Sequence, residues 1–402
     1  SFLIPYFIFV ALIGFTGVIG EMSFGRGTRS GPIDAFGLAC ETKGRRKLGE
    51  TLGRIPVAGA LAMAIGYTVV MGWIFRYMIG TFTGSTLAPA DIESFGSKFG
   101  GMASAWGNNL WQLAALVICM FILMYGVGSG IEKANKIMMP IFFVLFVILG
   151  IYVAFQPGAA AGYRYIFRVE PEVLAKPSTW IFALGQAFFS LSVTGSGMIV
   201  YGAYLSKEED VVGVAQHTGL FDTIAAVVAA LVIIPACVSY GMDVGAGPSL
   251  LFVTLPTILH DIPLGRLFAI ILYVAMIFAG VSSLQNMFEA VAESLLHKFP
   301  KLSRKAVLAL LGVICLGCGI GMETISKWGP WMDLVSIYII PIGATLGAVS
   351  WFYVMKKDEL LSAINTGAGR ERGAVWYAVG RYVYVPLAVI LCCVALFRHV
   401  AF

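Results

Sequence analysis

The stretch 185-GQAFFSLSVTGSGMIVYGAY-204 lies inside an apolar segment, yet its middle carries four hydroxyl residues and two glycines between positions 190 and 197. Each glycine lowers helix propensity by about 1 kcal/mol. In lipid, neighbouring hydroxyl groups can satisfy backbone groups that leave the helical hydrogen-bond ladder. We therefore predict a local unwinding between Ser192 and Gly197. The alternative is a close helix–helix contact made by small residues, and this stretch alone favours neither.

The composition around this stretch is that of a polytopic membrane protein. Of 402 residues, 59% are hydrophobic and 12% are charged, and the mean hydropathy is +0.87. A segment of about 20 apolar residues crosses a hydrocarbon core of roughly 30 Å. Ten such segments are predicted, at 3–25, 56–80, 109–128, 135–155, 179–204, 218–241, 265–296, 303–322, 331–355 and 376–398.

The basic residues of the loops give the orientation. Eighteen Lys and Arg residues fall on the side reached after the first span, and seven fall on the other side. Because cytoplasmic loops are enriched in Lys and Arg, residue 1 and the C-terminus are predicted to be external, in a cell (plasma or inner) membrane. The net charge of +5 reflects this bias and indicates no nucleic-acid partner. Since the sequence begins with neither Met nor a signal peptide, the topology predicts a further span before residue 1.

The residues that could carry catalysis are scattered. The four His residues lie in loops and at span ends, and none is paired with Cys, Asp or Glu at metal or triad spacing. The Cys315-x-x-Cys318 pair has no second pair and no nearby His, so it is interpreted as structural. The sequence therefore predicts that the protein is not an enzyme.

Polar residues inside the apolar segments are the functional candidates, because they are costly in hydrocarbon. In 278-FAGVSSLQNMFEAVAESLL-296, Ser282, Asn286, Glu289 and Glu293 form one helical stripe. Oxygen ligands without Cys or His suit a hard cation such as sodium. Each serine could instead bond its own helix backbone, and Glu293 is expected to be solvated. Asp222, in the first turns of an apolar span, is either an interfacial residue or a partner for a cation.

Several motifs together resemble the neurotransmitter:sodium symporter family, in its prokaryotic branch of amino-acid transporters. The similarity runs over essentially the whole chain. The motifs that carry it are 2-FLIPY-6, 185-GQAFFSLS-192, 201-YGAYL-205, 278-FAGVSS-283 and 332-MDLVSIYIIP-341.

The resemblance implies the LeuT fold, an all-α membrane domain of inverted five-helix repeats. The ten predicted spans then correspond to family helices 2–11. Residues 1–402 form a single transporter domain, in which 1–155 is the remainder of the first repeat, 179–355 is the second, and 376–398 is an additional helix. The broken sixth helix is expected to have a broken partner before residue 1.

The resemblance also implies two sodium sites, both completed by that preceding helix. The first would use Ser190 and Asp222, where many family members have Asn. The carboxylate beside the cation supplies the charge that other members take from chloride, so chloride independence is expected. The second would use Ala279, Ser282 and Ser283.

A substrate pocket and a gate are carried over in the same way. Tyr67 would bind the substrate carboxylate, Phe189 would close the pocket from outside, and Asp333 would pair with a basic residue of the preceding helix. Gly195 stands where many relatives have Phe, which predicts a pocket for a medium to large, even aromatic, hydrophobic amino acid. The expected pocket residues are Met63, Tyr67, Phe189, Ser192, Thr194, Gly195, Ser283 and Met287.

The function expected from these residues is sodium-coupled import of an amino acid by alternating access across the lipid bilayer. Two alternatives stay open at this point. A proton-coupled amino-acid permease of the same fold would also contain a broken helix. A non-transporting binding or scaffold protein becomes the better reading if the chain lacks a preceding helix.

Overall fold

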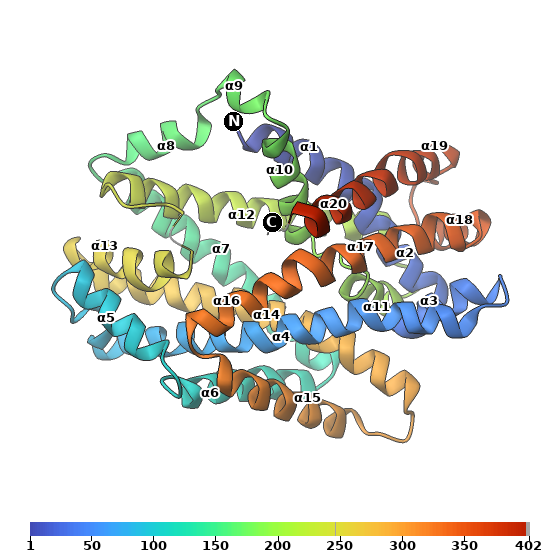
Figure 1. Cartoon of the computed structure of the whole chain (residues 1–402), viewed down its shortest axis with the longest axis horizontal. Helices are drawn as coiled ribbons and strands as arrows, with labels where there is room; N and C mark the ends of the chain where they lie inside the picture. Colours follow the sequence, from blue (N-terminus) through green and yellow to red (C-terminus); the bar gives the residue numbers. More distant parts are fainter. Residues whose placement is uncertain (246, 399–402) are drawn as a thin grey trace.

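The protein is a bundle of helices. The computed structural model describes residues 1–245 and 247–398, and every regular element among them is helical. Long apolar helices run side by side along the horizontal axis of Figure 1, while short helices and loops gather at its two ends. The predicted fold class, an all-α polytopic membrane protein, is confirmed.

Eight helical stretches among the described residues are long and apolar enough to cross a membrane. Some contain two α-helices joined by a π-helical turn, so one stretch can carry two labels. The stretches are Leu3–Thr28 (α1 Leu3–Ile13, α2 Ile19–Thr28), α4 Arg46–Thr83, Gly130–Ala154 (α7 Lys133–Ala154), α12 Val211–Ser239, α14 Gly265–Lys298, Arg304–Met322 (α15 Arg304–Gly319), Ile325–Val354 (α16 Ile325–Asp333, α17 Ile340–Val349) and Ala374–Phe397 (α19 Ala374–Val379, α20 Val385–Arg398).

The two remaining predicted spans differ from a continuous long helix. The segment predicted at 109–128 is the shorter α6, Asn109–Met124, which ends just before Gly126 with its φ of 85°. The segment predicted at 179–204 is broken into α10, Pro177–Ser190, and α11, Gly197–Tyr204. The predicted unwinding is therefore confirmed.

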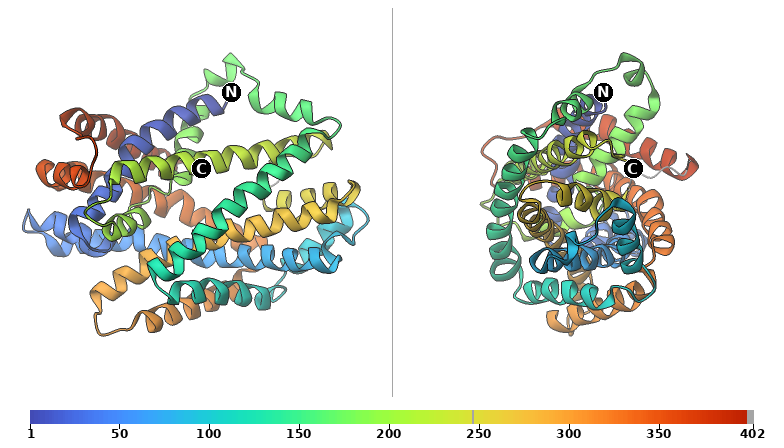
Figure 2. Two further views of the ribbon diagram at one scale, coloured as in Figure 1. Left: turned by 180° about the vertical axis from the view of Figure 1, so that it is seen from behind. Right: turned by 90° about the vertical axis from the view of Figure 1, so that its left-hand side faces the viewer.

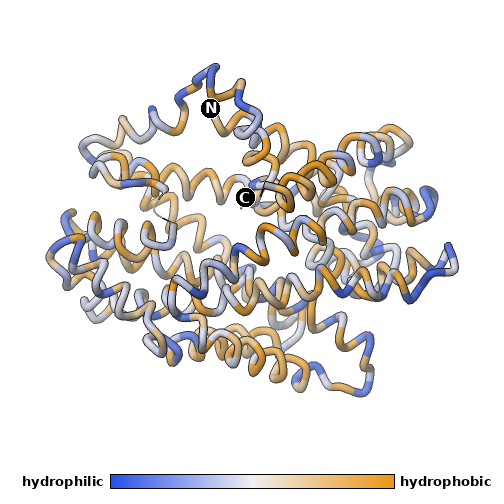
Figure 3. The backbone as a smooth tube through the Cα atoms, in the orientation of Figure 1, coloured by the Kyte–Doolittle hydropathy of each residue, from blue (hydrophilic) through white to orange (hydrophobic). Residues whose placement is uncertain are grey.

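Short helices close the two ends of the bundle. They are α3 Pro32–Glu41 and α18 Lys357–Asn365 at one end, and α5 Ile92–Met102, α8 Ala159–Phe167 and α13 Leu255–Asp261 toward the other, while α9 Pro171–Leu174 lies at the top edge of Figure 1. Hydrophilic segments concentrate at these ends, and the helices between them are largely hydrophobic (Figure 3). The right-hand view of Figure 2 looks nearly along the long helices and shows them packed into a bundle.

Two hydrophobic cores lie within the bundle. The first contains much of α4 and α14 and the buried Trp73, whose ring centroid lies 5.5 Å from that of Phe99 and 5.8 Å from that of Phe252. The second contains residues of α2, α10 and α11 and is anchored by the buried Trp351 and Tyr384. A cavity lined by α4, α14, α10 and α11 borders both cores, since Met63 of the first and Met198 of the second both line it.

Glycines let α2 and α11 approach backbone to backbone. A Cβ added at Gly202 would lie 2.0 Å from the Met22 carbonyl oxygen, and one at Gly25 would lie 1.9 Å from the Ile199 carbonyl oxygen. Only a residue without a side chain fits such a contact. The half-helix α11 is thus fixed to the first membrane stretch.

Candidate functional site

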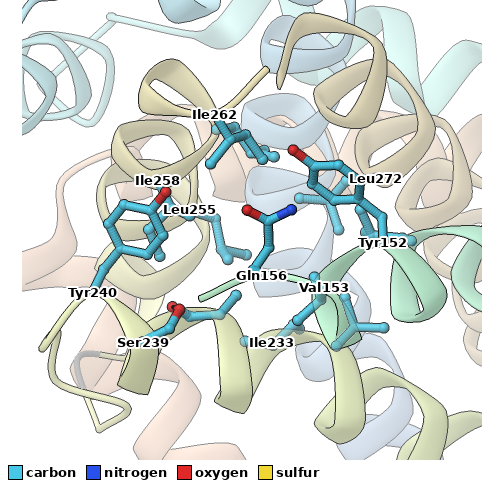
Figure 4. A pocket seen from close by; sticks show the side chains of 14 residues that line it. Tyr152, Val153, Gln156, Ile233, Ser239, Tyr240, Leu255, Ile258, Ile262 and Leu272 are labelled. Carbon is cyan, nitrogen blue, oxygen red and sulfur yellow. Dashed lines mark hydrogen bonds between the residues drawn. The ribbon is translucent and has the colours of Figure 1, made fainter. Parts of the chain in front are cut away.

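Two cavities differ sharply in size and polarity. An outer cavity of about 30 Å³ lies among α7, α12, α13 and α14, and its wall is almost wholly apolar, with Gln156 projecting toward its middle (Figure 4). That space has room for about two water molecules and is too small for an amino acid. The other cavity, here called the central cavity, has about 1250 Å³ and a partly polar wall. The central cavity is therefore the candidate site.

The broken helix forms one wall of the central cavity. Residues 191–196 are not helical, and Ser192 and Gly195 have φ values of 54° and 75°. Ser192, Thr194 and Ser196 all line the cavity. The helix is therefore interrupted where its hydroxyl side chains line the cavity.

Glu21 stabilises this break from the side of α2. Its side chain is fully buried, and it accepts hydrogen bonds from the backbone N–H groups of Ser196 at 2.9 Å and Gly195 at 3.2 Å. A carboxylate at this place satisfies orphan donors and complements the dipole at the start of α11. From the sequence, Glu21 could offset the charge of a cation, as Asp222 could, or be purely structural, and its hydrogen bonds to Gly195 and Ser196 fit the structural role. Two features of the sequence could have predicted this contact. Glu21 is a carboxylate inside the apolar segment 3–25, and the segment 179–204 was itself predicted to be broken.

The structure brings Ser190 and Asp222 together. The Ser190 hydroxyl at the end of α10 donates a hydrogen bond of 2.5 Å to Asp222 Oδ2 on α12. Tyr6 on α1 donates to the Ser190 Oγ at 3.3 Å. Three helices therefore contribute an all-oxygen group at the helix break, and Ser190 and Asp222 line the central cavity. Oxygen donors of this kind suit a hard cation.

The residues of the second expected cation site lie together on α14. Ser282 and Ser283 line the central cavity, and their hydroxyls donate to the Ala279 carbonyl at 2.8 and 3.1 Å. This back-bonding to the same helix is the alternative that the sequence left open. A cation at this place would have to compete with those two hydrogen bonds for the Ala279 oxygen.

Most expected substrate residues share the central cavity. Seven of the eight line it, and they come from α4, from α10 and the break that follows it, and from α14: Met63, Tyr67, Phe189, Ser192, Thr194, Ser283 and Met287. The Tyr67 hydroxyl lies within hydrogen-bonding reach of the Ser283 side chain. The cavity thus combines sulfur-containing apolar walls with a few hydroxyl groups, as small-molecule sites commonly do.

Gly195 is not among the lining residues, and its backbone explains why glycine stands there. A Cβ built on it would lie 2.6 Å from the Gly343 carbonyl oxygen, and its φ is positive. A side chain at this position would meet α17 instead of entering the cavity. The predicted enlargement of the pocket therefore does not follow from Gly195 in this backbone conformation.

Asp333 lies at the end of α16, is exposed, and forms no ion pair with any residue that the structure describes. Its neighbour Met332 lines the central cavity, whereas Asp333 does not. The structure therefore places Asp333 beside the site and leaves its predicted gating role without a partner among residues 1–245 and 247–398.

A buried ionic group lies at the α14 end of the cavity, here called the Arg304 cluster (Tyr204, Glu289, Glu293 and Arg304). Arg304 donates to both carboxylate oxygens of Glu289, at 2.8 and 2.5 Å. Tyr204 donates to Glu289 at 2.6 Å and to Glu293 at 2.8 Å. Glu293 is thus engaged and half-buried, contrary to its expected solvation, and Arg304 was not singled out in the sequence.

The chain is similar to known transporters. Residues 97–401 match the model of the sodium:neurotransmitter symporter family. The chain is 32% identical to YhdH, a sodium-dependent transporter of Bacillus subtilis, over 97% of this chain and 88% of the relative. It is 28% identical to a sodium-dependent transporter of Methanocaldococcus jannaschii, over 94% and 79% of the two chains.

A solved structure is similar over nearly the whole length. MhsT, crystallised in complex with L-phenylalanine, matches with a TM-score of 0.86 and 28% identity, and the match covers 98% of this chain and 91% of that one. The architecture is therefore the LeuT fold, as the sequence motifs indicated. The matches are to transporters and their family, and not to enzymes.

Proposed function

Because the chain belongs to the sodium:neurotransmitter symporter family, we propose that this sodium-dependent transporter imports a medium to large hydrophobic amino acid. The observation that carries the proposal is the Ser190–Asp222 pair at a helix break, inside a cavity whose walls include Met63 and Met287. The protein would act in the cell membrane, with residue 1 and the C-terminus outside.

Sodium is a co-transported substrate in this proposal. Asp222 supplies a negative charge and Ser190 a hydroxyl oxygen for one ion, and Ser282, Ser283 and the Ala279 carbonyl group supply oxygen for a second. Because the carboxylate of Asp222 already balances a cation, we propose that transport does not require chloride. One sodium ion moving down 100 mV contributes about 2.3 kcal/mol, and two contribute about twice that before the concentration gradient is added.

The substrate would lie against the broken helix. Tyr67 on α4 offers a hydroxyl to its carboxylate, and the methionines offer adaptable apolar surface to its side chain. Phe189 also lines the cavity. The size of the side chain is argued from the methionines and from the volume of the cavity, without Gly195.

Alternating access would use the elements that the break separates. α10 can move relative to α11 because residues 191–196 interrupt the helix between them. Binding of sodium at Ser190 and Asp222 would hold α10 against α12, and release would require that contact to open.

Competition binding tests the substrate class. We would measure displacement of labelled phenylalanine from the purified protein in 150 mM NaCl by glycine, alanine, leucine, phenylalanine and tryptophan, with choline chloride as the control salt. The proposal expects leucine, phenylalanine or tryptophan to displace the label at least ten times better than alanine or glycine, about 1.4 kcal/mol. A preference for glycine or alanine, or binding unchanged in choline, would contradict it.

A further inference from the structure

Arg381 is a cation with no carboxylate partner in the part of the chain that the structure describes. It lies in the π-helical turn Gly380–Tyr384, between α19 and α20. Its guanidinium carbon lies 4.4 Å from the ring centroid of Tyr353 and 5.8 Å from that of Tyr382, and its Nη1 donates to the Tyr377 hydroxyl at 3.4 Å. Among the described residues, no ion pair includes Arg381, and its buried Nε has no hydrogen-bond partner. Because Nε is enclosed by the protein, a ligand can reach only the Nη end of this partly exposed side chain.

The depth of Arg381 is set by two membrane stretches. The Tyr353 hydroxyl donates to the Arg381 carbonyl oxygen at 3.0 Å, and Tyr353 is one residue from the end of the stretch Ile325–Val354. Arg381 follows the start of its own stretch, Ala374, by about 10 Å of helix. Arg381 therefore lies about two helical turns inside its own span and beside the end of the other, a depth from which a long arginine side chain can extend to the lipid headgroups.

Two of the three rings around Arg381 are exposed, and the third, Tyr377, is buried. Tyr382 is 67% exposed, and Tyr353 and Val383 are each 43% exposed. A second cation approaches from α18, where Lys357 Nζ lies 5.6 Å from the ring centroid of Tyr377. The same end of the bundle carries α3 and α18, the side with the excess of basic residues. Two exposed tyrosines and an exposed lysine thus lie around the partly exposed Arg381, whose Nη1 donates to the buried Tyr377. These five residues are here called the Arg381 patch (Tyr353, Lys357, Tyr377, Arg381 and Tyr382).

We propose that the Arg381 patch binds the headgroup phosphate of an anionic phospholipid. Stacking on Tyr353 orients the planar guanidinium, whose N–H groups match the geometry of a phosphate. The exposed tyrosine rings contact the glycerol region, where aromatic side chains are favoured. Exposed Val383 continues the patch with apolar surface for an acyl chain, which a soluble phosphate ion would leave unused. Anionic lipid also concentrates at the leaflet that attracts basic residues.

Thermal unfolding with added lipid tests the proposal. The purified protein in a neutral detergent would be heated with phosphatidylglycerol, with phosphatidylcholine, or with inorganic phosphate at the same concentration. A ligand that binds only the folded protein raises its Tm, and we expect phosphatidylglycerol to raise it by about 2 °C or more above phosphatidylcholine. We expect inorganic phosphate alone to cause no such shift. Equal shifts with the two lipids, or an equal shift with phosphate, would overturn the proposal.

Variants assign the effect to the patch. Arg381→Gln is expected to abolish the difference between the two lipids, and Arg370→Gln, an exposed arginine outside the patch, is expected to keep it. Tyr382→Leu removes an exposed ring without opening the core, so it provides a second test if Arg381→Gln does not fold. Native mass spectrometry gives an independent readout, because retained phosphatidylglycerol adducts should fall in both patch variants. Unchanged adducts and an unchanged Tm difference in both patch variants would refute the assignment.

Discussion

Asp222 and Ser190 form the contact on which we propose that sodium coupling depends. Asp222→Asn removes the negative charge but keeps the shape and one oxygen. We expect the sodium concentration for half-maximal uptake to rise at least tenfold, since a charge-assisted contact contributes on the order of 1.5–3 kcal/mol. We also expect uptake by this variant to depend on chloride, which can replace the lost charge.

Sodium titrations of uptake in chloride and in gluconate measure both effects. Thr223→Ala is a matched control, because its hydroxyl bonds only the Gly219 carbonyl of its own helix. If Asp222→Asn titrated like the unaltered protein in both salts, Asp222 would not be a sodium ligand.

Glu323, which lies outside the membrane stretches, is expected to make the stability of the folded protein depend on pH. It lies between α15 and α16, is fully buried, and accepts one hydrogen bond from Trp73 Nε1 at 3.0 Å. Burial raises the pKa of Glu323 from 4.5 to about 7, although the Trp73 hydrogen bond and the charge of Arg76 oppose the rise. The folded protein therefore favours the protonated form, and stability is lost as pH rises from about 4.5 through 7.

Glu323→Gln keeps the shape of the protonated side chain and should remove this dependence. We expect the Tm of the variant to exceed that of the unaltered protein at pH 8 and to differ little at pH 5. Scanning fluorimetry across this range measures it, with the exposed Glu93→Gln as a control. Parallel pH curves for all three proteins would refute the prediction.

For single residues, the sequence predicted which side chains are functional candidates better than it predicted where those side chains point. Ser190 and Asp222 could be chosen because their polarity is conspicuous in apolar spans, and the structure joins them. The position of Gly195 against the Gly343 carbonyl could not be predicted, because it depends on a positive φ and on a helix 148 residues later in the chain. Arg304 was missed because an arginine at the start of a span is indistinguishable in sequence from a basic loop residue.

Among the elements, the contact of α2 with α11 holds the half-helix in place. Gly202→Ala would place a methyl group 2.0 Å from the Met22 carbonyl oxygen, so the helices must separate. Such overpacking costs about 1–3 kcal/mol, and we expect a lower Tm together with reduced uptake. Gly317→Ala on α15, where nothing lies within 4 Å, is the control and should leave both nearly unchanged. Equal Tm values for the two variants would contradict this packing.

The Arg304 cluster joins α11, α14 and α15. Arg304→Gln leaves Glu289, whose side chain is 1% exposed, without its charged partner. Losing one partner of a buried pair costs about 3–5 kcal/mol. We expect a large fall in Tm, and partial recovery when Glu289→Gln is added, because the double variant buries no unpaired charge.

A double-mutant cycle by thermal unfolding measures that coupling. Strictly additive effects of the two substitutions would show that Glu289 and Arg304 do not act as a pair. The Lys136–Glu132 pair serves as a control, since both of its side chains are exposed and a small coupling is expected there.

Element boundaries were predicted well where apolar runs end in charged loops. The break between α10 and α11 was predicted from two glycines among hydroxyl residues, and the structure confirms it. The extension of α4 back to Arg46 was not predicted, because residues 46–55 are polar and hydropathy detects only the part of a helix inside the membrane. The division into repeats at 1–155 and 179–355 stays a prediction.

For the whole molecule, the proposed function requires that the sodium gradient drive uptake through the central cavity. The sequence and the structure show the polytopic fold and the family. Coupling to an ion is measured by transport. The arrangement of Ser190, Asp222 and the broken helix supports sodium over protons because it offers several oxygen donors and not a lone titratable group.

The most direct measurement is uptake of labelled leucine or phenylalanine into proteoliposomes of the purified protein, under an inward sodium gradient or an inward proton gradient in choline. The account predicts concentrative uptake with the sodium gradient, its collapse when sodium is equal on both sides, and no concentrative uptake from the proton gradient alone. Equal concentrative uptake in sodium-free choline, driven by protons, would contradict it.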